Sequence, residues 1–541
     1  MNIDVLFGEH CVQSLEHTGY YSKLTINVPA REGKLMIRFS VPILDMHGFW
    51  TPSQRTPSSK IIWVIDSQSA GQRDFPFLSF FNTRQINRFS VGTTDLIDDT
   101  QIIAKMNQEK CCYDITITVA LQNGCDSFNL ILDQRPVLWT EALADWRKAL
   151  ELTLPAFPDA AWEPVFCTWY AVHAAVTQDW VEKNARIAAD LGFRTLIIDD
   201  GWCFDEMKRV SPQTITSWYE WIGDWNLSTT KFPDFEAHRR RVQAMGMKYL
   251  LWVTPFLIGE KSEFKKQYPS CCKPGYHEGC YTFDSHDEEA VRAMLDKLKH
   301  VIRDYGLDGL KIDFLDHIFP NIDAPEGRAV TSFIQKLSAA IREVKKNALI
   351  EYRQAYATPG MVTYATQFRA GDVPFDFIDN FQRIAQIRIS MGDQIPVHAD
   401  PVYWHPQESS MNISRHMIAS LAGVPMLSMD MLTVSKEQQK IVKRWLDFYK
   451  EKLDLFKNGK WKMYYYMSNT TALRVTAGKE TIIFLMDPAR LQEILKESSS
   501  DVYVLNLSQE NVELPGAEIV NEFGESLTNG MIPPGCSGYR A

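Results

Sequence analysis

The chain lacks the features that would mark a membrane, nucleic-acid-binding or metal-binding protein. No stretch of its 541 residues approaches the roughly 20 apolar residues of a membrane-spanning helix. Acidic residues outnumber basic ones by 67 to 57, and the net charge of −10 argues against a nucleic-acid partner, whose phosphates need a basic patch. The ten cysteines do not have zinc-site spacing. We therefore expect reduced thiols, and neither a metal nor a cofactor.

The N-terminal segment, Met1–Gln13, also lacks the basic start and apolar core of a secretory signal. Together with reduced thiols, this favours a cytoplasmic location. Aromatic residues, in contrast, are abundant, with 15 Trp, 20 Tyr and 29 Phe. Aromatic rings fill protein cores, and they also stack on sugar rings. The composition is therefore compatible with a sugar-binding protein but does not specify one.

Three sequence patterns follow one another along the chain. Residues 1–145 contain short runs rich in Val, Ile, Thr and Phe between turn residues, which predict an antiparallel β-sandwich, with a linking helix near residues 140–152. Residues 160–453 alternate strand-like and helix-like segments. Residues 455–541 return to alternating strands and predict a small antiparallel β domain.

The middle region contains eight strand-like segments, most of them followed by a helical pattern. These segments cover residues 165–170, 195–198, 249–254, 309–314, 349–352, 367–373, 395–398 and 424–428. Eight such repeats predict a (β/α)8 barrel. No good helix can be placed between the fifth and sixth strands.

Two of these strands end in acidic residues. In Gly309–Asp316, apolar residues alternate so that Lys311 and Asp313 share one face of the strand. Buried charge is costly unless it is paired or used, so this pattern is unlike ordinary core. Thr195–Trp202 ends in the same way, with two aspartates. The sequence therefore predicts a barrel whose mouth is rich in carboxylates.

Barrel enzymes place their chemistry at the C-terminal ends of the strands. The polar and aromatic residues expected at this rim are Trp169, Tyr170, Asp199, Asp200, Trp202, Trp252, Thr254, Lys311, Asp313, Asp316, Glu351, Arg353, Gln354, Arg369, Asp372, His398, Asp400, Trp404 and Asp430. Carboxylates that converge in this way shift one another's pKa values, which is how acid and base roles become separated.

Glycoside cleavage needs such a constellation. A retaining glycosidase uses one ionised carboxylate as nucleophile and a second, protonated one as acid, about 5–5.5 Å apart. Lys311 would lower the pKa of Asp313 and keep that carboxylate charged. Asp372, two strands further around the barrel, is placed to act as the acid, with Asp376 as a competing candidate. Asp199 and Asp200 would accept hydrogen bonds from sugar hydroxyls.

Several short motifs occur in order between about residues 164 and 430. They are Asp199-Asp200-Gly-Trp, Gly223-Asp-Trp, Lys231-Phe-Pro, Gly246-Met-Lys-Tyr-Leu-Leu-Trp-Val and Leu310-Lys-Ile-Asp. Any one of them is weakly specific. Together, and with β domains on both sides, they resemble the α-galactosidases of glycoside hydrolase family 36, which share a clan with families 27 and 31.

This resemblance implies roles for individual residues. Asp313 would be the nucleophile, and Asp372, in Arg369-Ala-Gly-Asp, the acid/base. Lys311 and the aspartate pair of the second strand would bind the terminal sugar. Trp225 would belong to a loop that closes the pocket, which relatives donate between subunits, so a homo-oligomer is an open expectation. The full set of expected substrate contacts is Asp199, Asp200, Trp202, Trp225, Trp252, Lys311, Glu351, Arg353, Arg369 and Trp404.

The sequence departs from the family after the fifth strand. Typical members carry a Cys and a Ser-Gly-Gly turn there, which shape the pocket around the 2-position of the sugar. This chain has Glu351-Tyr-Arg-Gln instead. A charged pair at this place could recognise a different 2-substituent or an acidic group, so the identity of the sugar stays open.

We therefore expect a retaining exo-α-glycosidase, foremost an α-galactosidase, that acts on a small oligosaccharide or glycoside. Three alternatives remain open from the sequence: an α-glycosidase for another terminal sugar, a non-catalytic sugar-binding protein, and a Schiff-base aldolase that uses Lys311. Transfer of the glycosyl group to an acceptor sugar instead of water is not distinguished by the residues.

Overall fold

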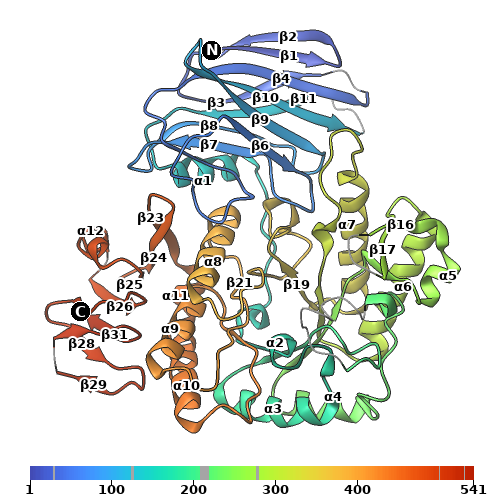
Figure 1. The fold of residues 1–541 in the computed structure, drawn as a ribbon, viewed down its shortest axis with the longest axis vertical. Helices are drawn as coiled ribbons and strands as arrows, with labels where there is room; N and C mark the ends of the chain where they lie inside the picture. The colour runs from blue at the N-terminus through green and yellow to red at the C-terminus, as the bar shows by residue number, and fades with distance from the viewer. Residues whose placement is uncertain (29–30, 123–126, 208–218, 276–278, 499, 529) are drawn as a thin grey trace.

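The computed structural model describes residues 1–541 except 29–30, 123–126, 208–218, 276–278, 499 and 529. A β-sandwich formed by the N-terminal residues lies against one side of a (β/α)8 barrel, and a smaller C-terminal β domain packs beside the barrel (Figure 1). The predicted fold class is thereby confirmed. None of the described helices combines the length and apolar character needed to cross a bilayer.

The sandwich consists of two antiparallel sheets with the strand orders β2-β1-β4-β10-β9-β6 and β3-β11-β8-β7-β5. Its strands are β1 Asn2–Phe7, β2 His10–Glu16, β3 Tyr21–Asn27, β4 Gly33–Pro42, β5 Gly48–Trp50, β6 Val64–Ser69, β7 Phe77–Phe81, β8 Asn87–Thr93, β9 Thr100–Asn107, β10 Cys112–Leu121 and β11 Ser127–Asp133. Alternate residues of β4, such as Leu35 and Ile37, point into a core shared with Leu130 and Leu132 of the other sheet.

The expected linking helix is α1, Trp139–Ala149, which lies against the sandwich. Trp139 donates its indole N–H to the side chain of Gln85 at 2.8 Å, and Trp146 donates to the carbonyl of Thr93 at 3.1 Å. Both indoles are buried. The helix therefore completes the core of the sandwich as well as connecting it to the barrel.

The barrel is formed by eight parallel strands in the order β21-β20-β19-β18-β14-β13-β12-β22. They are β12 Val165–Cys167, β13 Thr195–Ile198, β14 Lys248–Val253, β18 Gly309–Ile312, β19 Leu349–Arg353, β20 Gln367–Arg369, β21 Val397–His398 and β22 Met426–Leu427. A bridge between His398 and Val424 closes the ring. The strands match the eight expected segments, although several end earlier because their last residues turn into the mouth.

Amphipathic helices surround the barrel, each with its apolar face turned toward the strands. The helices of this part are α2 Trp169–Val172, α3 Gln178–Leu191, α4 Phe235–Ala244, α6 Glu288–Asp304, α7 Gly327–Val344, α8 Phe377–Met391, α9 Ser410–Leu421 and α10 Lys436–Glu451. In α7, Val330, Ile334, Leu337 and Ile341 are buried at helical spacing. Between β19 and β20 the chain forms only a short 3₁₀ turn, Pro359–Met361, where no helix was expected.

An insertion after β14 forms a small antiparallel sheet, order β15-β17-β16, with one short helix. Its elements are β15 Leu257–Gly259, α5 Glu263–Gln267, β16 Cys272–Pro274 and β17 Cys280–Phe283.

The C-terminal domain differs in one respect from the expected antiparallel arrangement. Its elements are α11 Leu453–Asn458, β23 Lys460–Tyr466, β24 Asn469–Ala477, β25 Glu480–Leu485, α12 Leu491–Lys496, β26 Asp501–Asn506, β27 Val512–Glu513, β28 Glu518–Val520, β29 Ser526–Leu527, β30 Met531–Ile532 and β31 Ser537–Arg540. Strands β25 and β26 pair in parallel, while the other pairs of this domain are antiparallel. The intervening α12 provides the crossover that a parallel pair requires.

The sandwich contacts the barrel through the N-terminal end of α7. Asp99 accepts hydrogen bonds from the backbone N–H of Gly327 at 2.7 Å and of Asn321 at 2.8 Å, so it satisfies the start of this helix from another part of the chain. Asp98, whose side chain is fully buried, binds Arg328 through two hydrogen bonds of 2.6 and 2.8 Å. A Cβ at position 327 would lie 2.3 Å from the carbonyl of Ile97, so only glycine allows this approach.

Candidate active site

Asp313 follows β18 directly and is held by several donors at the barrel mouth. It accepts hydrogen bonds from the indole N–H of Trp252 at 2.9 Å, from Arg353 Nη1 at 3.0 Å and from the backbone N–H of Phe314 at 2.9 Å. Phe314 has a left-handed φ of 58°. This conformation is unusual for a bulky residue and indicates strain at the strand end.

A buried ion pair lies next to this carboxylate. Lys311 Nζ donates to Asp199 Oδ2 at 2.5 Å and lies 3.7 Å from Asp313 Oδ2. The thiol of Cys167 also donates to Asp199, at 3.2 Å. Burial alone would lower the pKa of Lys311, but the two aspartates raise it above its ordinary value. The lysine is therefore a stable ammonium group.

The charge state of Asp313 follows from these neighbours. Only 4% of this residue is exposed, and burial alone would raise the pKa of its carboxyl. Arg353 and Lys311 outweigh burial and hold the pKa of Asp313 well below its usual range. An ionised carboxylate in a nearly dry site has the properties of a nucleophile.

Asp372 lies three residues after β20 and is more open, with 38% of its side chain exposed. It accepts a hydrogen bond from Arg369 Nη2 at 3.0 Å, and Arg353 Nη1 lies 3.7 Å away. Burial would raise the pKa of Asp372, but Arg353 and Arg369 lower it to about 2. In this state of the protein both mouth carboxylates are ionised.

Arg353 joins the two carboxylates. The same Nη1 atom lies 3.0 Å from Asp313 Oδ1 and 3.7 Å from Asp372 Oδ2. The two oxygens therefore cannot be farther apart than the sum of these distances, which is the scale of one sugar ring. Two carboxylates that face each other across so short a gap can attack and protonate opposite sides of one bond.

Arg369 lies behind Asp372 in a buried network. Its Nη1 donates to Asp400 Oδ1, while Asp400 Oδ2 accepts from the hydroxyl of Tyr170 and from the backbone N–H of Val373, both at 2.7 Å. Burial and the charge of Asp372 raise the pKa of Asp400 to about 7, although Arg369 opposes this shift.

Glu351 and Arg353 share one face of β19 but lie at different depths of the barrel. Glu351 is fully buried inside the barrel, where it accepts a hydrogen bond from Gln367 at 3.0 Å and lies 3.4 Å from His398 Nδ1. Arg353 is the last residue of β19, two positions nearer the mouth, and there it contacts Asp313 and Asp372. The geometry therefore does not bring Glu351 to the open mouth.

Three of the predicted tryptophans pack against one another. Trp202 and Trp252 flank Trp225, with ring centroids 6.4 and 5.9 Å away. All three are buried. Trp404 is also buried, and its ring centroid lies 6.4 Å from that of His416. These indoles therefore belong to the buried packing around the pocket and do not offer exposed ring surfaces to a sugar.

Two residues of the site were not singled out from the sequence. Tyr219 is buried and packs against Phe314, the neighbour of Asp313, with ring centroids 6.0 Å apart; burial together with the charges of Asp200 and Asp313 raises its pKa well above the ordinary value. It lies between β13 and α4, far from any strand end, so no periodic signal marks it. Cys167 donates to Asp199, and a hydrogen bond from a thiol to a carboxylate leaves no pattern in the sequence.

One group of three side chains in the described part of the chain has the spacing of metal ligands. It comprises Asp284, His286 and Glu326. Lys273 Nζ already lies 3.2 Å from Asp284 and 2.7 Å from Glu326, so an ammonium group compensates these carboxylates. This group is best explained as an ion-pair cluster.

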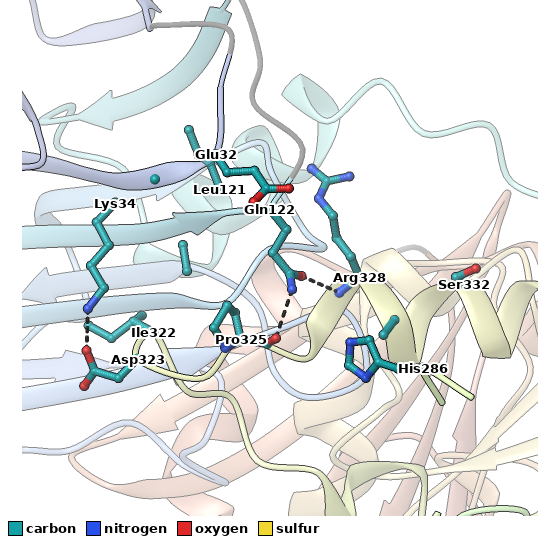
Figure 2. A pocket seen from close by; sticks show the side chains of 13 residues that line it. Glu32, Lys34, Leu121, Gln122, His286, Ile322, Asp323, Pro325, Arg328 and Ser332 are labelled. Atoms are coloured by element: carbon teal, nitrogen blue, oxygen red, sulfur yellow. Dashed lines mark hydrogen bonds and ion pairs between the residues drawn. The ribbon is translucent and has the colours of Figure 1, made fainter. Parts of the chain in front are cut away.

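A cavity of about 730 Å³ lies between the sandwich and α7 (Figure 2). Gln122 crosses it, donating to the carbonyl of Pro325 at 2.9 Å and accepting from the backbone N–H of Arg328 at 3.1 Å. Lys34 and Asp323 form an exposed ion pair at its edge. Of the two acidic residues that line this cavity, Glu32 and Asp323, the second is paired with Lys34, so we assign the cavity to the junction between domains and place the candidate active site at the barrel mouth.

A family model described as Melibiase matches residues 151–459 of the chain. Among curated proteins, the chain is 22% identical over 385 residues to the bifunctional alpha-galactosidase/sucrose kinase AgaSK of Mediterraneibacter gnavus, which covers 68% of this chain and 39% of that protein. It is 27% identical over 118 residues to alpha-galactosidase AgaA of Geobacillus stearothermophilus, which covers 22% and 15%, respectively. The chain thus matches less than half the length of either relative.

Among solved structures, the fold is similar to a GH36 alpha-galactosidase AgaA variant from Geobacillus stearothermophilus in complex with raffinose. The TM-score is 0.68 at 13% sequence identity, and the match covers 100% of this chain and 81% of that one. At this identity the likeness concerns the fold.

Proposed function

Because this chain belongs to the melibiase family, we propose that it is a retaining exo-α-glycosidase that removes terminal α-galactosyl residues. One observation carries the proposal: Asp313 and Asp372 meet at a single nitrogen of Arg353, 3.0 and 3.7 Å away. The upper limit that these two distances set on the separation of the carboxylate oxygens is compatible with a pair that cleaves one glycosidic bond with retention of configuration.

In the proposed reaction, Asp313 attacks the anomeric carbon while Asp372 gives its proton to the leaving oxygen. A covalent bond forms between the sugar and Asp313 as the glycosidic bond breaks. Asp372, now ionised, then takes a proton from water, which attacks the same carbon and releases Asp313. Lys311 and Trp252 keep Asp313 charged and correctly oriented.

Arg353 has to leave Asp372 before this sequence can begin. A guanidinium between the two carboxylates occupies the space that the anomeric centre needs, and it holds Asp372 ionised. We propose that the incoming sugar displaces Arg353 from Asp372. The loss of that positive charge raises the pKa of Asp372, so the acid takes up a proton as the substrate binds.

The sugar-binding groups in this proposal are the buried pair Asp199 and Asp200 together with Lys311, which offer acceptors and a donor to sugar hydroxyls. Arg353 belongs to the segment after the fifth strand that departs from the family pattern, so the alternative of a different terminal sugar stays open. The substrate is a small oligosaccharide or glycoside. The Schiff-base alternative is disfavoured, because such a lysine needs a lowered pKa, whereas that of Lys311 is raised.

A panel of aryl α-glycosides tests the proposal, combined with NMR of the first anomer released. We expect the α-galactoside to be the best substrate and α-galactose to appear before mutarotation. Initial release of the β-anomer would mean inversion. Binding of galactose without any turnover would favour the sugar-binding alternative, and preference for an acidic or 2-substituted glycoside would reassign the sugar.

A further inference from the structure

Asp400 lies beside Asp372 and contacts neither the nucleophile nor the sugar-binding aspartates. It follows β21 and is fully buried. Its Oδ2 accepts hydrogen bonds from the Tyr170 hydroxyl and from the backbone N–H of Val373, both at 2.7 Å. Val373 is the residue next to Asp372. The Asp400 carboxylate therefore fixes the backbone next to Asp372, the acid/base candidate.

Asp400 is itself fixed by α8. Asn380 donates its amide to the carbonyl of Asp400 at 2.9 Å and accepts the Asp400 N–H at 3.0 Å. Both residues are buried. Asp400 is thus held by both β21 and α8, so we expect its carboxylate to stay in place when Asp372 moves.

Arg369 divides its charge among three carboxylates. It donates to Asp400 and, at 3.0 Å, to Asp372, and its Nε lies 3.8 Å from Glu351. Unlike Arg353, this arginine is 2% exposed and enclosed, so a substrate cannot displace it. An arginine paired with Asp372 alone would hold it ionised, and an acid catalyst must carry a proton.

Resting on the proposed function, we propose that Asp400 is a positioning residue for Asp372. Asp400 fixes the backbone next to Asp372 and takes up part of the charge of Arg369. The charge of Asp400 then allows Asp372 to hold a proton once Arg353 has left. The groups that face Asp400 are Tyr170, Arg369, Asp372 and, beyond the arginine, Glu351 with His398. Because Asp372 and Asp400 oppose each other's ionisation, their titrations are coupled.

The test is Asp400→Asn, which preserves the shape and removes the charge. Without that negative charge the pKa of Asp372 falls, so we expect the alkaline limb of the kcat–pH profile to move down by about one unit. On raffinose, kcat at neutral pH should fall about tenfold or more, with KM within about twofold. On p-nitrophenyl α-galactoside, whose leaving group needs little protonation, the loss should be much smaller. Equal losses on both substrates with an unmoved profile would overturn the proposal.

A second variant keeps the proposal testable if Asp400→Asn does not fold. Tyr170→Phe removes one donor to Asp400, which raises the pKa of Asp400 and so reduces its charge. We expect the alkaline limb to move in the same direction by a smaller amount. Asp234→Asn, at the N-cap of α4, makes the same chemical change at an exposed residue and should leave the profile in place. Circular dichroism and thermal melts check that all variants fold.

Asp372→Asn separates this inference from the proposed function. If that variant retains raffinose hydrolysis, the acid/base assignment fails, whatever Asp400 does. If Asp372→Asn is inactive on raffinose while Asp400→Asn changes neither the pH profile nor the substrate ratio, only the role of Asp400 is refuted.

Discussion

Among single residues, Arg353 has the strongest influence on the charge of the carboxylates at the barrel mouth. It pairs with both carboxylates and, together with Arg369, lowers the pKa of Asp372 to about 2. A free protein in this state has a nucleophile but no acid. The proposed reaction therefore depends on ligand binding to change the charge of its own catalyst.

Replacing Arg353 tests this dependence. In Arg353→Met the pKa of Asp372 in the free protein should rise, because its strongest cationic neighbour is lost. The alkaline limb of kcat/KM, which reports free-enzyme groups, should then move to higher pH, whereas that of kcat should move little. Initial rates over a range of pH provide the measurement. An unmoved kcat/KM profile would show that Arg353 does not govern Asp372.

Asp313→Asn is the direct test of the nucleophile. The amide keeps the size of the side chain and can still accept from Trp252, so the fold should be retained. Turnover of an aryl α-galactoside should fall by at least about 10⁴-fold, because no covalent intermediate can form. Near-normal activity in a folded variant would remove Asp313 from its role.

At this scale the sequence predicted the carboxylates better than their partners. Asp313 and Lys311 could be recognised because charge at the end of an apolar strand is unusual. The bridge from Arg353 to Asp372 and the burial of Glu351 depend on side-chain directions around a closed ring. Asp400 stood on the expected rim, but only three-dimensional contact shows that its partner is the backbone of Val373.

At the scale of secondary-structure elements, the pairing of β18 with β19 aligns the nucleophile with Arg353. Gly309 faces Leu349 across this pair, and a Cβ at position 309 would lie 2.0 Å from the carbonyl of Leu349. The missing side chain lets the two strands approach. Hydrophobic alternation predicted both strands, but not this contact between their backbones.

Gly309→Ala should therefore push the two strands apart. We expect a loss of about 3 kcal/mol in the free energy of unfolding and a marked loss of activity, because Asp313 and Arg353 lose their alignment. Thermal melts and kcat/KM provide the measurements. Gly19→Ala is a matched control, since its added methyl would make only ordinary contacts, the nearest at 3.4 Å. Similar behaviour of the two variants would contradict this account of the strand pair.

At the scale of the whole molecule, a buried ion pair joins the sandwich to the barrel, beside an apolar cluster that Trp50, Phe75 and Phe77 share with the barrel. Asp98 is fully buried and depends on Arg328 for compensation. The periodic patterns predicted a sandwich before a barrel, and we retain the division at residues 1–145, 160–453 and 455–541 as a proposal. They could not predict how the domains dock, because the docking contacts come from loops without periodicity.

Arg328→Ala should destabilise this junction by about 2 kcal/mol, because it leaves a carboxylate buried without its partner. The double variant Asp98→Asn, Arg328→Ala should recover part of the loss by removing the stranded charge. Lys34→Ala, which breaks an exposed ion pair across the same junction, should cost less than about 0.5 kcal/mol. Urea unfolding curves compare the three. A loss of similar size for Lys34→Ala and Arg328→Ala would refute the importance of burial.

The start of α7 depends on a carboxylate that lies 228 positions earlier in the chain. A recombination experiment that exchanges whole sandwiches among relatives would break this helix cap unless the donor supplies an aspartate and the recipient a glycine at the matching places. Residues 99 and 327 should therefore be inherited together, and hybrids that separate them should be lost during selection for soluble, folded protein.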